Sequence, residues 1–196
     1  MKRNNLVKWV LLGVVAILLI WVWRSYNGLV DSQLTVEESY AQVQTDYQRR
    51  ADLIPNLVNT VKGAANFEQT TLTQVIEARA KATSTTINAN DLTPENVQKF
   101  QQAQGQLSGA MSRLLVSVEN YPDLKANANF QSLMAELSGT ENRINAARVD
   151  FNAAVETYNT SIKTVPNVFF AGIFGYKEKG FFAAEVGADK TPKVNF

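Results

Sequence analysis

The first hydrophobic pattern along the chain is an apolar run near its start. Residues 6–23 read LVKWVLLGVVAILLIWVW and contain one charged residue, Lys8. A helix of this length measures about 27 Å, close to the thickness of the hydrocarbon core of a bilayer. The long stem of Lys8 can carry its charge to the head groups. The pattern therefore predicts a single transmembrane helix over residues 6–23.

A cleaved signal peptide is the alternative interpretation of this run, since it too would begin with basic residues followed by an apolar core. Signal peptides normally end in small residues, whereas Trp21, Trp23, Arg24 and Tyr26 make the end of this run bulky. Aromatic residues at this place are typical of a membrane interface. We therefore expect the helix to be retained as an anchor.

The basic residues around the run predict its orientation. Lys2, Arg3 and Lys8 lie on the amino-terminal side, and Arg24 alone lies close to the other end. Because basic residues stay preferentially on the cytoplasmic side, we expect a cytoplasmic N-terminus. The remainder of the chain, from Ser25 on, would then lie outside the cytoplasm.

Beyond the span, apolar residues recur every three or four positions, and the first such segment covers residues 31–82. This spacing predicts one long amphipathic helix with coiled-coil-like periodicity, continuing the membrane helix with a break near Asn27 and Gly28. Pro55 lacks an amide hydrogen and presses on the carbonyl of Ala51, so we expect a kink there rather than an end. The apolar positions are Val36, Tyr40, Val43, Tyr47, Ile54, Leu57, Val61, Ala64, Leu72 and Val75.

A second helix is predicted after a polar connection over residues 83–93. Thr93 as N-cap and Pro94 in the first turn favour a helix start, and Tyr121 followed by Pro122 favours its end. The apolar stripe of this helix is Val97, Phe100, Gln104, Leu107, Met111, Leu114, Val118 and Tyr121, in which Gln104 alone is polar.

A third helix is predicted to begin at a cap formed by Asn127 or Asn129 and to end before Pro166. The remaining residues combine many aromatic side chains with glycine, and we expect a packed, largely irregular tail with at most one or two helical turns. The stripe of the third helix is Phe130, Leu133, Leu137, Ile144, Ala147, Phe151, Val155, Tyr158 and Ile162.

The predicted fold class is therefore all-α. Residues 1–25 form a cytoplasmic N-terminus and transmembrane anchor, residues 26–165 an antiparallel bundle of three long helices, and residues 166–196 an aromatic tail packed on the bundle. The first helix is the longest, so its turns nearest the membrane extend beyond the second helix. Either the third helix and the tail cover them, or a second copy of the chain does, which favours a homo-oligomer.

The composition of the 196 residues excludes several classes of function. The chain contains no cysteine and no histidine, which removes disulfides, thiolate chemistry, the usual near-neutral base and the commonest metal ligand. Leaving out the four basic residues around the span, 15 Lys and Arg face 18 Asp and Glu, so nucleic acid is not an expected partner. We expect no catalytic residue, no metal and no cofactor.

Several segments in one order resemble the LemA family over essentially the whole chain. These segments are YNGLV (26–30), RRADLIPNLV (49–58), VKG (61–63), EARA (77–80), RLL (113–115), ENYPDLKAN (119–127), GTENRI (139–144), YNT (158–160) and PKVNF (192–196). The resemblance implies a bacterial inner-membrane protein with an amino-terminal span and an antiparallel helical bundle outside it, without an established reaction. The chain departs from the family at residues 64–68, AANFE, where the family often has an aromatic residue and a histidine. The missing histidine weakens any metal or acid–base role at this position.

Charged residues on the predicted helices supply the first set of candidate site positions. A cluster around Pro55 is either a binding surface for an anionic head group or acidic partner, or a set of inter-helix ion pairs that fixes helix register. We favour the second interpretation, with Arg50 on the apolar stripe. The candidate positions are Arg49, Arg50, Asp52, Pro55, Lys62, Glu68 and Arg79, with Glu119, Glu141 and Asp150 as candidate partners.

The aromatic tail supplies the second set. Phe169, Phe170 and Phe174 either contact a lipid surface or a partner groove, or pack against the bundle, which we favour.

Together these patterns favour a non-enzymatic scaffold or oligomerisation module of the cell envelope, anchored in the bilayer. The alternative is an adaptor or regulator that recruits a membrane protease or another envelope protein. An envelope hydrolase is least favoured, because catalytic carboxylates must converge in a pocket and a slender bundle offers few places for one.

Overall fold

The structure, a computed structural model, describes residues 2–63 and 67–183, and within these ranges the regular secondary structure is entirely helical. The all-α prediction is confirmed. The elements are α1 (Lys2–Lys62), α2 (Gln69–Ser84), the 3₁₀ turn η1 (Ala89–Asp91), α3 (Pro94–Val118), α4 (Pro122–Lys125), α5 (Ala128–Lys163) and α6 (Asn167–Phe174).

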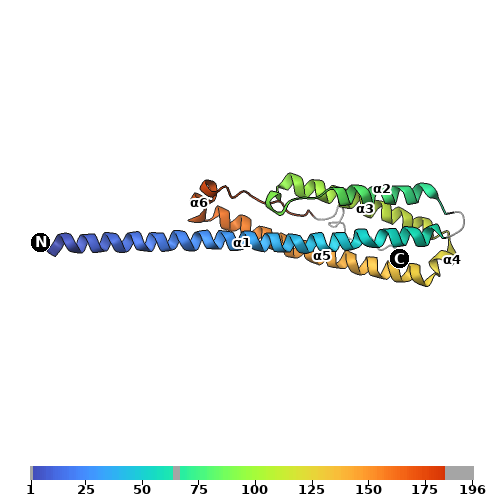
Figure 1. Ribbon diagram of the computed structural model, residues 1–196, viewed down its shortest axis with the longest axis horizontal. Coiled ribbons are helices and arrows are strands. Elements are labelled where there is room, and N and C mark those ends of the chain that lie inside the picture. The colour runs from blue at the N-terminus through green and yellow to red at the C-terminus, as the bar shows by residue number, and fades with distance from the viewer. Residues whose placement is uncertain (1, 64–66, 184–196) are drawn as a thin grey trace, which may run out of the picture.

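The helices form an elongated bundle from which the amino-terminal half of α1 projects alone (Figure 1). α5 packs along α1, and α2 packs along α3. α6 lies at the end of the bundle from which α1 projects, and α4 lies at the opposite end. We call these the membrane-proximal and the distal end. Among the described residues, α1 is the one helix long and apolar enough to cross a membrane, and none of its apolar window is buried.

α1 is one continuous helix from the predicted span into the bundle, so the predicted break near Asn27 and Gly28 is wrong. A helix tolerates a glycine in its interior at a cost of about 1 kcal/mol, and Leu29, the next residue, is fully buried against the bundle. The expectation that the helix continues through Pro55 is confirmed. The span and the first bundle helix are therefore one rod.

The long helix predicted over residues 31–82 is two helices, α1 and α2, which reverse direction between Lys62 and Gln69. Gly63 follows the last residue of α1, and beyond the turn Phe67 is buried with its ring 5.0 Å from that of Tyr121. The apolar stripe runs through both helices because both face the same core, so periodicity gave no sign of the reversal. The bundle is thus built from α1, α2, α3 and α5; Ala64 lies outside the described residues.

The predicted helix starts agree with the structure. The Thr93 hydroxyl accepts a hydrogen bond from the Asn96 amide at 3.3 Å, with Pro94 as the first residue of α3. Asn127, rather than Asn129, caps α5, because its side-chain oxygen accepts from the amides of Asn129 and Phe130. These caps satisfy amides that have no partner within the helix.

The buried side chains form two clusters. The proximal cluster contains Leu29, Val36, Tyr40, Val43, Tyr47, Ile87, Leu92, Val97, Phe100, Ile144, Ala147, Phe151, Ala154, Val155, Tyr158, Ile162, Ala171 and Phe182. The distal cluster contains Leu53, Ile54, Leu57, Val58, Val61, Phe67, Leu72, Val75, Ala82, Leu107, Ala110, Leu114, Val118, Leu124, Phe130 and Leu137.

The membrane-proximal stripe of α1 is covered from within the chain. Val36, Tyr40 and Val43 are fully buried, and the Tyr40 ring lies 5.8 Å from that of Phe151 on α5. Phe182 from the tail joins the same cluster. The first of the two predicted alternatives therefore holds, and this stripe needs no second copy to cover it. The tail contributes the two turns of α6 and then irregular backbone to residue 183; its remaining residues, 184–196, lie outside the described part of the chain.

Candidate functional site

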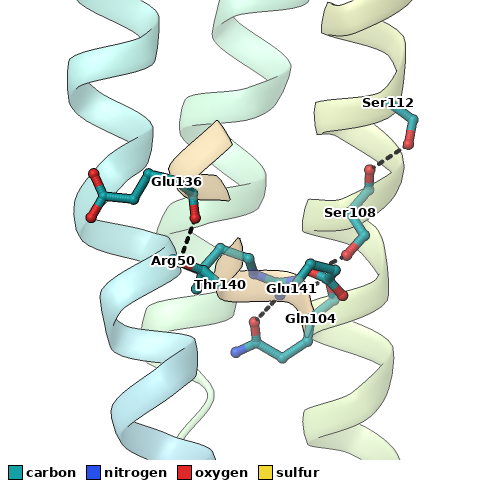
Figure 2. A network of polar contacts seen from close by, with 7 residues as sticks. All are labelled: Arg50, Gln104, Ser108, Ser112, Glu136, Thr140 and Glu141. Atoms are coloured by element: carbon teal, nitrogen blue, oxygen red, sulfur yellow. Dashed lines mark hydrogen bonds and ion pairs between the residues drawn. The ribbon is translucent and has the colours of Figure 1, made fainter. Parts of the chain in front are cut away.

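A buried arginine lies between the two apolar clusters, since Tyr47 before it belongs to the proximal cluster and Leu53 after it to the distal cluster. Figure 2 shows this arginine, Arg50, with its polar neighbours. Arg50 on α1 is 5% exposed, and its guanidinium reaches two neighbouring helices. Nη1 donates to Glu141 Oε2 on α5 at 3.0 Å and to Ser108 Oγ on α3 at 3.0 Å, while Nη2 donates to Gln104 Oε1 at 2.7 Å. We call these four residues the Arg50 layer.

Gln104 extends this layer to the fourth long helix. Its Nε2 donates to the carbonyl oxygen of Ala82 at 3.3 Å. Ala82 lies in the last turn of α2, where carbonyls have no donor within the helix. The one polar residue in the α3 stripe therefore joins Arg50 to α2, and the Arg50 layer contacts all four long helices of the bundle.

Two further ion pairs join α1 to α5 beside the Arg50 layer. Arg49 pairs with Glu136 at 3.0 Å on the surface, and Asp46, which is buried, lies 3.7 Å from Arg143. Asp46 precedes Arg50 by one helical turn and carries the opposite charge. A shift of α5 along α1 would separate the buried charges of Asp46 and Arg50 from their oppositely charged partners on α5, which is costly in a low-dielectric interior. The pairs therefore favour one register of α5 on α1.

The Arg50 guanidinium also lies against an aromatic ring. Its Cζ is 4.9 Å from the centroid of the Tyr47 ring, a geometry that stabilises a cation when water is excluded. Nε of Arg50 has no hydrogen-bond partner among the described residues. An open groove passes outside the layer, with Glu141, Gln101 and Arg148 along it. This arrangement can hold helices together and present polar groups to a partner.

Pro55 creates a second polar contact between helices. Without an amide hydrogen, Pro55 leaves the carbonyl of Ala51 without its helical donor, and Nε of Arg79 on α2 donates to that oxygen at 2.7 Å. Two of the predicted site residues, Pro55 and Arg79, thus act on one backbone carbonyl. This hydrogen bond favours one position of α2 along α1.

The other charged candidates do not converge on a site. Asp52 accepts from Gln48 at 2.8 Å on its own helix, and Glu68 accepts from Thr71 at 3.1 Å at the start of α2. Lys62 lies exposed in the last turn of α1. Glu119 is exposed just after α3. Among the described residues, no group of three or more acidic side chains is placed to share a metal ion.

A segment of the tail, residues 176–183, is held on the bundle by side-chain amides, and we call it the strap. Three side-chain amides each bond both backbone groups of one strap residue, as a neighbouring β-strand would. Asn159 Nδ2 donates to the Lys179 carbonyl, and the Lys179 amide donates to Asn159 Oδ1, both at 2.9 Å. Asn152 does the same for Phe182 at 2.9 Å, and Gln101 for Ala183 at 2.8 and 3.0 Å.

The strap lies close to the start of α3. The Gly180 amide donates to the Leu92 carbonyl at 2.8 Å. A Cβ at Gly180 would lie 2.6 Å from Cα of Pro94, so this approach requires glycine. Lys179 is buried beside the Tyr158 ring, with Nζ 5.3 Å from its centroid, and burial lowers the pKa of this lysine.

The amide contacts of the strap were not predicted from the sequence. Asn152 and Asn159 are seven residues apart, which puts them two turns apart on one face of α5. That spacing beside the apolar stripe was the available signal. The corresponding signal for the Arg50 layer was Gln104, the polar residue within the α3 stripe. Nothing in the sequence indicated that Asp46 is buried, because Asp46 resembles any charged surface residue.

The three tail phenylalanines, for which packing against the bundle was the favoured prediction and a lipid or partner contact the alternative, are only partly packed. Phe170 is half-buried, whereas Phe169 and Phe174 are exposed. The Phe174 ring lies 5.3 Å from the Tyr26 ring in an edge-to-face contact. Because Tyr26 follows the predicted span directly, α6 lies beside the point where α1 leaves it.

Comparison of the sequence with known proteins shows which family it resembles. The sequence model described as "LemA family" matches residues 39–196. The chain is 26% identical to magnetosome protein MamQ 2 of Paramagnetospirillum magneticum over 204 residues, covering 93% of this chain and 73% of that protein. It is 25% identical to protein LemA of Metamycoplasma hominis over 145 residues, covering 74% of this chain and 62% of that protein. With magnetosome protein MamQ of Magnetospirillum gryphiswaldense the identity is 33% over 95 residues, covering 47% of this chain and 35% of that protein.

Proposed function

This chain belongs to the LemA family, and on that premise we propose that it is a non-enzymatic scaffold of the bacterial cell envelope, anchored in the inner membrane with its bundle outside the cytoplasm. The observation that carries the proposal is the continuity of α1. One helix forms the span and also contributes side chains to both apolar clusters. A closed helical body is thereby held at a fixed position above the bilayer.

Continuity matters because a helix transmits orientation. A flexible linker would let the bundle rotate freely relative to the membrane, whereas an unbroken helix fixes both its height and the face it presents. Copies anchored in one membrane then meet in similar orientations, which reduces the entropy lost on association. Self-association in the plane of the membrane is the scaffold function we propose.

The polar chemistry of the bundle supports binding rather than catalysis. Arg50, Asp46 and Arg79 are each engaged in contacts between helices. These groups hold the four helices in register, so they are structural rather than available to a substrate. The outer surfaces of α3 and α5 remain for contact with other molecules.

The test is to count copies in the membrane. The full-length protein would be extracted with its surrounding lipid in polymer nanodiscs, and the mass of each particle measured. We expect particles with two or more copies. A variant with a Gly-Ser insertion after Gly28 should keep its helical circular dichroism and lose most of these particles. Single copies in every disc, with or without the insertion, would contradict the scaffold.

An adaptor for another envelope protein, such as a membrane protease, is the second candidate. The strap supports it, because the face formed by Gln101, Asn152 and Asn159 already holds an extended peptide segment of this chain. Photo-crosslinkers at the exposed Val149 on α5 and Val116 on α3 separate the two functions. Adducts between copies support the scaffold, and one heavier adduct with a different protein supports the adaptor.

A further inference from the structure

α6 carries exposed apolar side chains outside the span. Its residues read NVFFAGIF and include no charge. Within the helix, Phe169 and Ile173 are 67% and 77% exposed and lie four residues apart, so they form one apolar row. Elsewhere on the described bundle, the exposed large apolar residues Leu34, Ile76, Val116, Val149 and Phe181 lie on separate helices or on the strap. A contiguous exposed patch of this kind marks an interaction site.

The opposite face of α6 is fixed to the bundle. Ala171 is buried in the proximal cluster, and Phe174 contacts Tyr26 of α1. Gly175 ends the helix in the left-handed conformation, with φ of 77°, and the Tyr176 amide closes the turn on the Ala171 carbonyl at 2.9 Å. α6 is therefore held in place with its apolar row facing outward.

The height of α6 relative to the membrane follows from α1. Tyr26 lies three residues beyond Trp23, the last residue of the apolar run, which is about 4.5 Å along a helix. The interfacial layer on each side of the hydrocarbon core is of the order of 5–8 Å thick. The contact between Phe174 and Tyr26 therefore places α6 at the level of the head groups, at the membrane-proximal end of the bundle (Figure 1).

We propose that α6 is an interfacial membrane helix, which inserts Phe169 and Ile173 into the leaflet from which α1 emerges. Amphipathic helices lie in this way with the apolar face 5–10 Å deep in the interface. Lys163 pairs with Glu178 at 2.9 Å, which leaves Arg24 and Lys177 as exposed cations close to the ends of the contact. Because α6 itself carries no charge, the insertion is apolar and neutral lipid suffices for it. Together with the span, it would hold the bundle at one tilt and rotation.

The test uses the absence of cysteine from the chain. Phe169→Cys and Ile173→Cys variants of the full-length protein would carry an environment-sensitive fluorophore, in phosphatidylcholine nanodiscs with one copy each. Val149→Cys, on an equally exposed position of α5, is the matched control. We expect blue-shifted emission and quenching by nitroxide-labelled lipid at positions 169 and 173, and neither at position 149.

Three results would overturn the proposal. The first is quenching at positions 169 and 173 no stronger than at position 149. The second is a blue shift that occurs only in discs holding several copies, which would assign the α6 surface to a second copy of the chain. The third is quenching that occurs only when phosphatidylglycerol is added, which would make the contact electrostatic. Circular dichroism of each labelled variant checks that the helices are intact, and because both side chains are exposed we expect no change.

Discussion

The two halves of the bundle are held together by different side chains. Among the described residues, five pairs of aromatic rings lie within the proximal cluster, formed by Tyr40, Tyr47, Phe100, Phe151 and Phe182. Tyr158 adds a sixth pair with Tyr176, which packs against the cluster. The distal cluster is mainly aliphatic, with Phe67 and Tyr121 as its one ring pair among the described residues. Large rings leave gaps unless each is matched by a partner, and in the proximal half the strap supplies Phe182 as that partner. The proximal half therefore depends on a segment from the end of the chain, whereas the distal half closes with helices alone.

The Arg50 layer lies where the two halves meet. Tyr47 and Phe100 on one side belong to the proximal cluster, and Leu53 and Leu107 on the other side belong to the distal cluster. A buried polar layer of this kind contributes little net stability but favours one register. We expect it to separate the bundle into two regions that open with different free energies.

The largest effect is expected from removing an aromatic side chain of the proximal cluster. Phe151→Ala should lower the free energy of unfolding by about 3–5 kcal/mol, because the fully buried ring leaves a cavity. Hydrogen exchange should then accelerate at the strap amides Lys179 and Phe182. Leu114→Ala, in the distal cluster, should cost about 2–5 kcal/mol while those amides stay protected. If both variants accelerate exchange equally in both halves, the bundle is one cooperative unit.

The next effect concerns the layer between the halves. Arg50→Ala removes the buried guanidinium, which pairs with the partly exposed Glu141, and leaves Gln104 Oε1 without its donor. We expect the free energy of unfolding to fall by about 2–4 kcal/mol, measured by urea denaturation followed by circular dichroism. Arg49→Ala, which breaks the exposed pair with Glu136, is the control and should cost less than about 1 kcal/mol. Equal losses in the two variants would mean that burial of Arg50 has no energetic consequence.

The strap provides a smaller, local effect. Asn152→Ala removes both hydrogen bonds to Phe182, at about 0.5–1.5 kcal/mol each, and exchange at the Phe182 amide should accelerate while α2 and α3 are unchanged. Asn145→Ala, at an exposed position of the same helix, is the control. Gly180→Ala should release the strap as well, because its methyl would contact Pro94. Unchanged exchange in both strap variants would show that the amides do not hold this segment.

The last effect is expected from alkaline pH, where two contributions of opposite sign partly offset each other. Burial raises the pKa of Tyr40 and of Tyr158 from 10 to about 12, so the folded chain keeps protons that the unfolded chain loses above pH 10. The contribution of these two tyrosines to the free energy of unfolding is fully present below pH 10 and decreases towards pH 12. At pH 11 the decrease is about 1.4 kcal/mol per tyrosine.

Lys179 contributes with the opposite sign. Burial lowers its pKa from 10.5, so the folded state gains stability as pH rises from that lowered value towards 10.5. Because Tyr40 and Tyr158 both lie in the proximal cluster, hydrogen exchange in that half should accelerate first as pH rises from 10 to 11. Tyr40→Phe should reduce the effect. Earlier loosening of the distal half would contradict the assignment.

Local signals in the sequence were enough to predict most of the helices. The apolar length of the span, the caps at Thr93 and Asn127, and the spacing of the stripes each depend on residues within one or two turns, and each agrees with the structure. The sequence also showed that the Ala51 carbonyl lacks its helical donor, because Pro55 has no amide hydrogen. The reversal between α1 and α2 was not evident from the sequence, because a stripe keeps its phase on either side of a turn.

What the sequence by itself determined is therefore the anchor, the helical fold class and the face that each helix buries, since these depend on composition and on a period of 3.6 residues. Only the tertiary structure decided that Arg50 donates to Glu141 and Gln104, that Arg79 donates to the Ala51 carbonyl, and that the strap closes the proximal half. It also decided that α6 lies beside Tyr26. Many side chains can supply a charge or an amide. Which of them pair is settled by the distances that arise once distant segments pack against one another.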